Sequence, residues 1–322
     1  MIASLLIAFA AGAASALMFA SIISGALISL LLFYLAPLPL MVAALGWGPV
    51  TAAIGGIAAG TSLGLLFGMP YLAAFVFTVA LPAWWLGHLA LLGRPVTAEV
   101  PGVNGAAATP PVVEWYPVGR MLLWTAGFAA FTTMGALLTL GTDGDTIVSA
   151  LRRALTRILG SRGGASDSEQ VINALVTIAP AAAAIVAIMT LTLNLWLAGR
   201  IIVTSGRLNR PWPELKSAAL PPMTMVALCL AIALSFMGGI VGIFSQIVTS
   251  ALMMAYALTG FAALHMLTMG MKSRVMVLGL TYAMVLVLGW PILTMVGLGL
   301  ADAFFGFRQR FLARKPPSST VA

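Results

Sequence analysis

Long apolar stretches without a charged residue alternate with short polar segments along this chain. Asp, Glu, Lys and Arg are absent from residues 1–93, 121–142, 170–199, 217–271 and 275–301. The hydrocarbon core of a bilayer is about 30 Å thick and takes about 20 apolar residues per helix. Every backbone polar group inside it needs an internal partner, so the crossing segments are expected to be helices. The pattern predicts an all-α fold, a polytopic bundle of transmembrane helices.

Dividing the apolar stretches by the length of one span gives about nine membrane segments, and counts of eight to ten fit as well. Glycine and proline mark several of the joins, as at Gly46-Trp47-Gly48-Pro49. The predicted spans lie near residues 2–20, 25–45, 48–68, 71–92, 119–140, 171–203, 222–243, 247–270 and 275–303. Together they predict a single integral membrane domain over residues 1–307.

Composition excludes the other common classes of protein. Hydrophobic residues make up 61% of the chain and charged residues 7%, against about 25% charge in an average soluble domain. A soluble globular protein, a disordered chain and a disulfide scaffold are excluded. The net charge of +8 comes from basic residues scattered over the loops, as the positive-inside rule requires. Such residues attract anionic lipid head groups, so we expect the lipid bilayer as partner and no nucleic acid.

Two segments are predicted to lie outside the spans. Apolar residues recur at helical spacing within residues 145–160, at Ile147, Leu151, Leu155 and Ile158. This pattern predicts an interfacial amphipathic helix within the loop 141–165. The basic tail 308–322 is predicted to be disordered.

Two spans contain helix-breaking residues. Tyr34 is followed by Pro37 and Pro39 in the second span, and Gly289-Trp290-Pro291 interrupts the last one. The last run then forms either two half-helices that enter and return, or one span that leaves the C-terminus outside. Broken helices at membrane depth line cavities or protein-buried sites, so Tyr34, Pro37 and Pro39 are candidate ligand-binding residues.

Two polar residues within the spans are further candidates. Asn194 is the most polar point of the sixth span, and it is either a ligand contact or an interhelical hydrogen-bonding residue. Asp302 lies in an otherwise apolar run, where an unpaired carboxylate would be costly. We expect Arg308 or Arg274 as its partner, and Asp302 is then either half of a structural ion pair or a ligand contact.

Four glycines recur at a spacing of four along the third span, at Gly56, Gly60, Gly64 and Gly68. Small residues at this spacing let helix backbones approach closely. The row is therefore either a packing face within one subunit or a docking face for another membrane protein or a second copy.

Short apolar motifs resemble a known family. The run Phe33-Tyr34-Leu35-Ala36-Pro37-Leu38-Pro39 followed by Gly46-Trp47, and the closing pattern Gly299-x-x-Asp302-x-x-Phe305-x-Phe307-Arg308, are similar to those of the YybS-like predicted bacterial membrane proteins. That family, which has no assigned activity, resembles in hydropathy the S components of energy-coupling-factor vitamin transporters. The resemblance implies a multi-pass protein of the bacterial cytoplasmic (inner) membrane and, through the S components, docking to a partner by small-residue helix faces.

The leading functional hypothesis is a small-molecule-binding or transport component that resembles an S component. The alternative is a non-transporting structural, assembly or interaction protein, for which the glycines and breaks serve only packing. The sequence has no H-E-x-x-H, Walker A or G-x-S-x-G motif, so we expect no enzyme, no metal and no cofactor.

Overall fold

The computed structural model describes residues 2–96, 112–159, 165–212 and 218–313, and nearly all of them lie in helices. Within these residues one antiparallel pair of strands occurs, β1 (Gly93–Val96) and β2 (Val112–Trp115), with Arg94 opposite Glu114. The guanidinium of Arg94 pairs with the Glu114 carboxylate at 2.7 Å. The all-α class predicted from the apolar pattern is confirmed.

Seven helical segments in the described part of the chain are long and apolar enough to cross a membrane. They are Ile2–Ser24, Leu27–Trp47, Pro49–Phe67, Met69–Leu91, Val118–Leu138, Glu169–Thr204 and Gly239–Leu267. Large apolar side chains on them point outward, including Leu27 at 91% and Leu65 at 89% exposure. Surfaces so rich in exposed apolar side chains are suited to lipid, so the chain is a multi-pass integral membrane protein.

The chain divides into two compact units, one of residues 1–121 and 190–213 and the other of residues 122–189 and 214–322. Two long helices, α7 (Val118–Leu138) and α9 (Ala165–Thr204), contribute residues to both units. Each unit is described by itself below.

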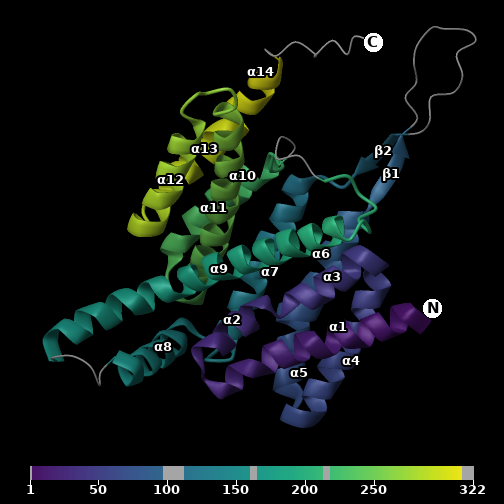
Figure 1. Ribbon diagram of the computed structural model, residues 1–322. Coiled ribbons are helices and arrows are strands. Elements are labelled where there is room, and N and C mark those ends of the chain that lie inside the picture. Colours follow the sequence, from purple (N-terminus) through teal and green to yellow (C-terminus); the bar gives the residue numbers. More distant parts are fainter. Residues whose placement is uncertain (1, 97–111, 160–164, 213–217, 314–322) are drawn as a thin grey trace, which may run out of the picture. The chain divides into compact units, whose positions relative to one another are not determined.

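The first unit is a helical bundle followed by the strand pair (Figure 1). Its other elements are α1 (Ile2–Ala20), η1 (Ser21–Ser24), α2 (Leu27–Leu35), α3 (Pro37–Trp47), α4 (Pro49–Phe67), α5 (Met69–Phe75), the π-helical turn η2 (Val76–Ala80) and α6 (Leu81–Leu91). Helices α1 and α4 touch backbone to backbone, because a Cβ at Gly12 would fall on the carbonyl oxygen of Gly55 and one at Gly55 on that of Ala8.

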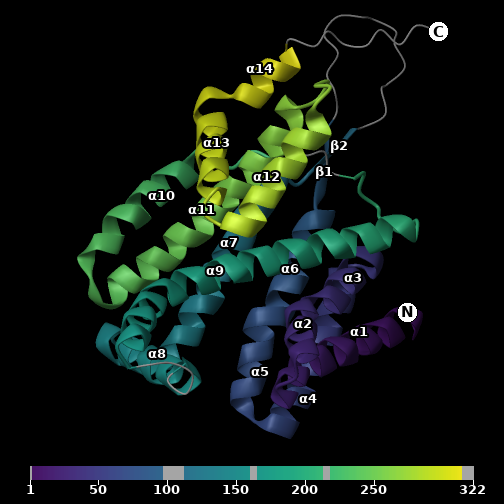
Figure 2. The same ribbon diagram turned by 60° about the vertical axis from the view of Figure 1, so that its left-hand side comes forward.

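The second unit is built around the long helix α11 (Figure 2). Its elements besides parts of α7 and α9 are α8 (Gly144–Leu159), α10 (Met223–Leu234), η4 (Ser235–Met237), α11 (Gly239–Leu267), α12 (Arg274–Leu288), α13 (Ile292–Phe305) and α14 (Phe307–Ala313). A Cβ at Gly260 of α11 would fall on the carbonyl oxygen of Met295, and one at Gly299 of α13 on that of Tyr256. Glycine at both positions thus lets the two backbones meet.

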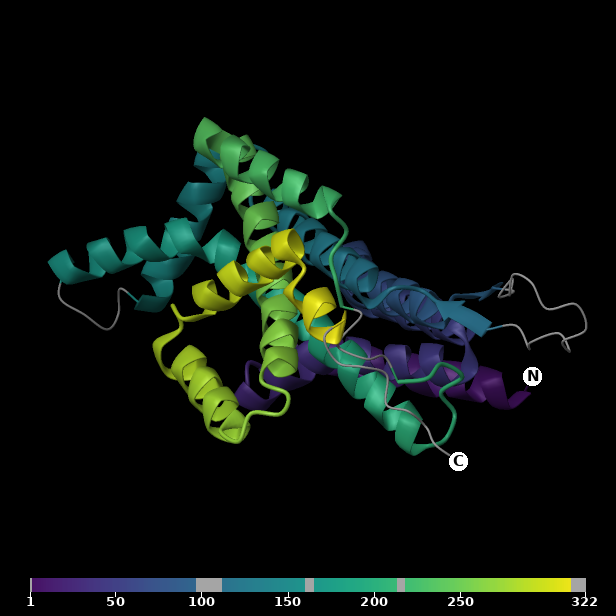
Figure 3. The same cartoon turned by 90° about the horizontal axis from the view of Figure 1, so that it is seen from above.

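The last apolar run forms two short helices, as one of the two predicted alternatives requires. Gly289 has φ 71° and ends α12, and Pro291 precedes α13. The helices have 15 and 14 residues, about 22 Å at 1.5 Å per residue, which is short of a bilayer core of about 30 Å. Helix α12 has no buried residue and stands to the side of α11 and α13 (Figure 3). Its Tyr282 ring stacks on Phe261 of α11, with 5.1 Å between centroids.

Two predicted boundaries differ from the structure. The seventh and eighth spans were separated near residues 243–247, but the chain breaks at Gly238-Gly239, where φ is 73° and 57°. Only glycine adopts two such successive conformations readily, so α10 is short and α11 is long, and the count of about nine spans stays a prediction. Residues 308–313, predicted to begin a disordered tail, continue α14 because Asp302 binds the start of that helix. The rest of the tail, 314–322, lies outside the described residues.

The segment predicted as an amphipathic helix forms the helix α8, with Ile147 fully buried and Ile158 exposed, and its position in the membrane interface stays a prediction. It begins after Asp143, which accepts a hydrogen bond from the Thr146 hydroxyl at 2.5 Å and one from the Thr146 N–H at 2.8 Å. These bonds hold the pKa of the Asp143 carboxyl below its ordinary value, with the hydroxyl contributing most. The end of the predicted loop, residues 160–164, lies outside the described residues.

We expect Gly299→Ala to destabilise the protein by about 1–3 kcal/mol, the usual result of overfilling a packed contact. The added methyl group must push the α13 backbone away from Tyr256. The midpoint of thermal unfolding in detergent measures the effect. Gly297→Ala is the matched control on the same helix, because its methyl group meets no atom within 4 Å and removes a flexible residue, a gain of roughly 0.5–1 kcal/mol. Equal midpoints for the two variants would contradict the close crossing.

Candidate functional site

The two charged residues Asp302 and Arg308 form a buried pair at the end of α13. The Nε atom of Arg308 donates to Asp302 Oδ2 at 2.6 Å, and the Arg308 backbone N–H donates to Oδ1 at 2.9 Å. The two side chains are only 6% (Arg308) and 4% (Asp302) exposed. Arg308 is therefore the basic partner, and the alternative expectation of Arg274 was wrong.

The local sequence explains why these residues meet. Gly306 adopts the left-handed conformation, φ 65° and ψ 39°, and its N–H donates to the Asp302 carbonyl at 2.8 Å. This is a glycine cap of α13, and it turns the chain so that Arg308 comes back over Asp302. A charge-assisted bond to both the side chain and the backbone of one residue fixes α14 on the end of α13.

A cavity of about 510 Å³ lies beside this pair, within the second unit. Besides Asp302 and Arg308, its polar lining comes from Tyr256 and Thr259 of α11 and from Gln309 and Arg310 of α14. Tyr256 and Thr259 are almost fully buried. Among the residues that the structure describes, the wall contains one carboxylate, two guanidinium groups, an amide and two hydroxyl groups, which suits a polar solute that carries a negative charge or strong hydrogen-bond acceptors.

A second polar cluster lies at the break of the second span, in the first unit. Pro37 and Pro39 have no N–H to donate, and the helix is interrupted between α2 and α3. The Nδ2 group of Asn194 donates to the carbonyls of Tyr34 and Thr190, at 2.8 Å each. The structure therefore brings Asn194 and the proline break together through an interhelical hydrogen bond.

A further bond supports the same break: the Ser15 hydroxyl of α1 donates to the carbonyl of Ala36 at 2.6 Å. Asn194 is 1% exposed, and its Oδ1 atom accepts no hydrogen bond from the residues that the structure describes. Ser15 and Asn194 thus give the carbonyls of Ala36 and Tyr34 hydrogen-bond donors from other helices at the break. The predicted candidates fall into two clusters, since Asp302 belongs to the second unit.

The glycine row of α4 lies against helices of the same chain. A Cβ at Gly56 would be 3.0 Å from the Cβ of Ala80, one at Gly60 would be 3.2 Å from Val76, and one at Gly64 would be 2.9 Å from Leu72. Gly68, with φ 93°, ends α4 and turns the chain into α5. Three glycines therefore face the segment α5–η2, which occupies this face of α4.

Sequence reasoning missed Tyr256, Thr259, Gln309 and Arg310. Tyr256 and Thr259 lie four and one residues before Gly260, so the glycine that holds α13 also marks the turn of α11 that faces the cavity. Gln309 and Arg310 were assigned to the tail. Among the residues searched, no group of three or more His, Cys, Asp or Glu could hold a metal ion.

The chain matches no protein-family model, and comparison with curated proteins and with solved structures likewise finds no similar protein.

We expect Asp302→Asn to insert into the membrane but to lower the free energy of unfolding by about 3–5 kcal/mol, because the buried Arg308 guanidinium loses the carboxylate that pairs with its Nε atom. Arg308→Gln should behave similarly, and the double variant should recover part of the loss. Unfolding in detergent gives the coupling energy of the pair. Arg310→Gln is the control, since Arg310 is exposed on the same helix. Additive effects of the two single changes would mean that the pair does not hold α14.

For the proline break, we expect Asn194→Leu to lower the free energy of unfolding by about 1–3 kcal/mol, because the Tyr34 carbonyl loses a buried partner. Thr192→Val, two residues earlier on α9, is the control. The Thr192 hydroxyl is buried without a hydrogen bond to the described residues, so its removal should be neutral or stabilising. The free energy of unfolding of both variants is measured with urea or heat. A larger loss of this free energy for Thr192→Val than for Asn194→Leu would refute the role of Asn194.

Proposed function

We propose that this chain is a small-molecule-binding component of a membrane transport system, similar in role to an S component and located in a bacterial cytoplasmic membrane. The observation that carries the proposal is the buried Asp302–Arg308 pair in the wall of a cavity of about 510 Å³. Ionisable groups within apolar membrane segments are costly, and they usually mark the path or site of a solute.

The cavity lining favours a small solute with a negative group. In the described part of the lining, two guanidinium groups stand against one carboxylate. The Asp302 carboxylate accepts a hydrogen bond from the Nε atom of Arg308, which fixes the position of the guanidinium in the wall of the cavity. Arg310 adds a second cation at the exposed end of the lining.

The two helices of the last apolar run are held to α11 unequally. Helix α13 is fixed on α11 by the glycine contact, whereas α12 has no buried residue and contacts α11 through the stacked Tyr282 ring. Helix α12 can therefore move without separating the packed core, and none of its residues is among the described lining of the cavity. Discontinuous helices beside a solute site are common in transporters.

The alternative function is a non-transporting structural or assembly protein. It is favoured by the bond from the Arg308 backbone to Asp302, which a purely structural fastening of α14 would also need. If the protein has this structural function, the cavity holds no solute and the Asp302–Arg308 pair only stabilises the fold.

Native mass spectrometry of gently extracted protein separates these functions. We expect a small molecule to leave with the wild-type chain and to be lost from Ala303→Trp, because Ala303 lines the cavity and an indole would fill it. Leu293→Trp is the control, an exposed position on the same helix outside the lining. A wild-type chain without any bound small molecule, or retention in Ala303→Trp, would favour the structural alternative.

A further inference from the structure

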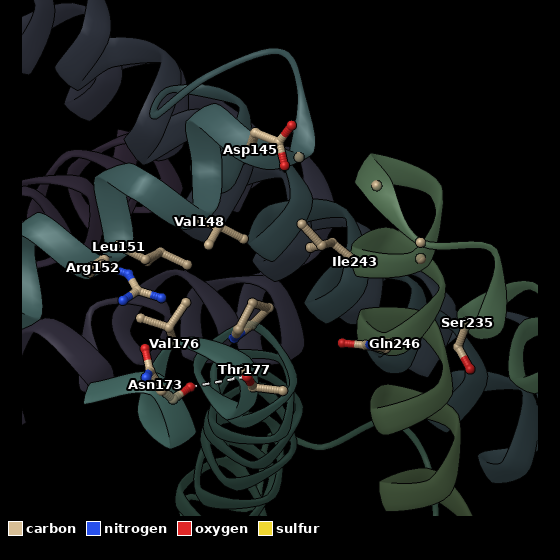
Figure 4. Close-up of a pocket in the computed structure, with 15 residues that line it drawn as sticks. Asp145, Val148, Leu151, Arg152, Asn173, Val176, Thr177, Ser235, Ile243 and Gln246 are labelled. Atoms are coloured by element: carbon tan, nitrogen blue, oxygen red, sulfur yellow. Dashed lines mark hydrogen bonds between the residues drawn. The ribbon is translucent and has the colours of Figure 1, made fainter. Parts of the chain in front are cut away.

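A second polar cavity, of about 420 Å³, lies where α8 meets the first turns of two spans. Its polar lining comes from Asp145 and Arg152 of α8, Asn173 and Thr177 of α9, Ser235 of η4 and Gln246 of α11. Figure 4 shows the Arg152 guanidinium and the Gln246 amide extending into the space from opposite sides. This cavity is separate from the Asp302 site, with which it shares no lining residue.

We expect the cavity to lie at the level of the lipid head groups. Helix α8 connects the end of one span, α7, to the start of another, α9. It packs on the start of α11, where a Cβ at Gly144 would be 2.9 Å from the carbonyl carbon of Gly239. An amphipathic helix with arginines on its polar face is suited to the membrane interface, and the start of a span lies there too.

The lining includes an acidic and a basic side chain that are far enough apart to contact the two ends of a zwitterion. Asp145 and Arg152 are seven residues apart on α8, about 10 Å of helix rise. Asp143 is engaged in capping through Thr146, which leaves Asp145 as the carboxylate of the lining. A guanidinium suits a phosphate, and a carboxylate suits an ammonium group.

We propose that this cavity binds the zwitterionic head group of an aminophospholipid of the phosphatidylethanolamine type. Arg152 holds the phosphate, Asp145 the ammonium group, and the amides of Asn173 and Gln246 the glycerol and ester oxygens. The apolar side chains of Val148, Leu151, Val176 and Ile243 in the lining receive the first methylene groups of the acyl chains.

A lipid fits better than a free solute of the same chemistry. Apolar side chains continue from the cavity along α8, at Leu155, which is half-buried, and Ile158, which is 62% exposed. They follow Leu151 by four and seven residues, which puts them on the face of α8 that lines the cavity. Acyl chains that leave the cavity therefore have an apolar surface to follow, which a free phosphoethanolamine would not need.

The test measures lipid retained by the full chain after purification from vesicles of equal phosphatidylethanolamine, phosphatidylglycerol and phosphatidylcholine. We expect phosphatidylethanolamine to be enriched on the wild-type chain, and Arg152→Ala to reduce its retention about tenfold, the loss that follows removal of a charge-assisted hydrogen bond. Asp145→Asn should shift the preference from phosphatidylethanolamine toward phosphatidylglycerol, because the ammonium loses its partner.

Arg153→Ala is the matched control, because Arg153 is the next residue on α8, donates to the Ser149 hydroxyl at 3.5 Å and does not line the cavity. It should retain lipid as the wild type does. Equal losses for Arg152→Ala and Arg153→Ala would overturn the proposal in favour of general surface charge. Displacement of the lipid by millimolar phosphoethanolamine alone would assign the cavity to a free solute, and absence of any enriched lipid would also overturn it. None of these results depends on the Asp302 cavity.

Discussion

The contact of α11 and α13 at Gly260 and Gly299 determines where every group of the candidate site lies. The carbonyl oxygens of Met295 and Tyr256 occupy the positions that side chains at these glycines would need. Apolar side chains gain little by leaving lipid for one another, so helix association in membranes depends on such close packing. Because α13 is held there, Asp302 reaches the level of Tyr256 and Thr259, and the Gly306 turn can bring Arg308 over it.

At the breaks in the helices, polar side chains form hydrogen bonds with the backbone. Where Pro37 and Pro39 interrupt a span, Asn194 and Ser15 donate to the carbonyls at the break. Where α13 ends, Asp302 accepts from the backbone N–H of Arg308. An apolar environment makes each unpaired carbonyl or N–H costly, so polar residues in the spans of this chain lie beside irregular backbone. The breaks in the helices are therefore the places where polar side chains of the spans gather.

The sequence predicts the helical membrane class, because lipid requires long apolar stretches whatever the details of packing. It also predicts α8, the break before Pro291 and the pairing of Asp302 with an arginine, since periodicity, proline and burial of charge act locally. The break at Gly238-Gly239 was missed because glycine is frequent in membrane helices, so its conformation is set by tertiary packing. Tyr256 and Thr259 were missed because their role depends on α13, which is more than thirty positions further along the chain.

The most direct measurement is a cryo-electron microscopy map of the chain in lipid nanodiscs at a resolution that shows side chains. We expect the map to show the α13 carbonyl of Met295 against Gly260, the Asp302 carboxylate on Arg308, and non-protein density in the cavity beside them. Helices α11 and α13 held apart by side chains, or an Arg308 side chain directed into solvent with the cavity closed, would contradict this expectation.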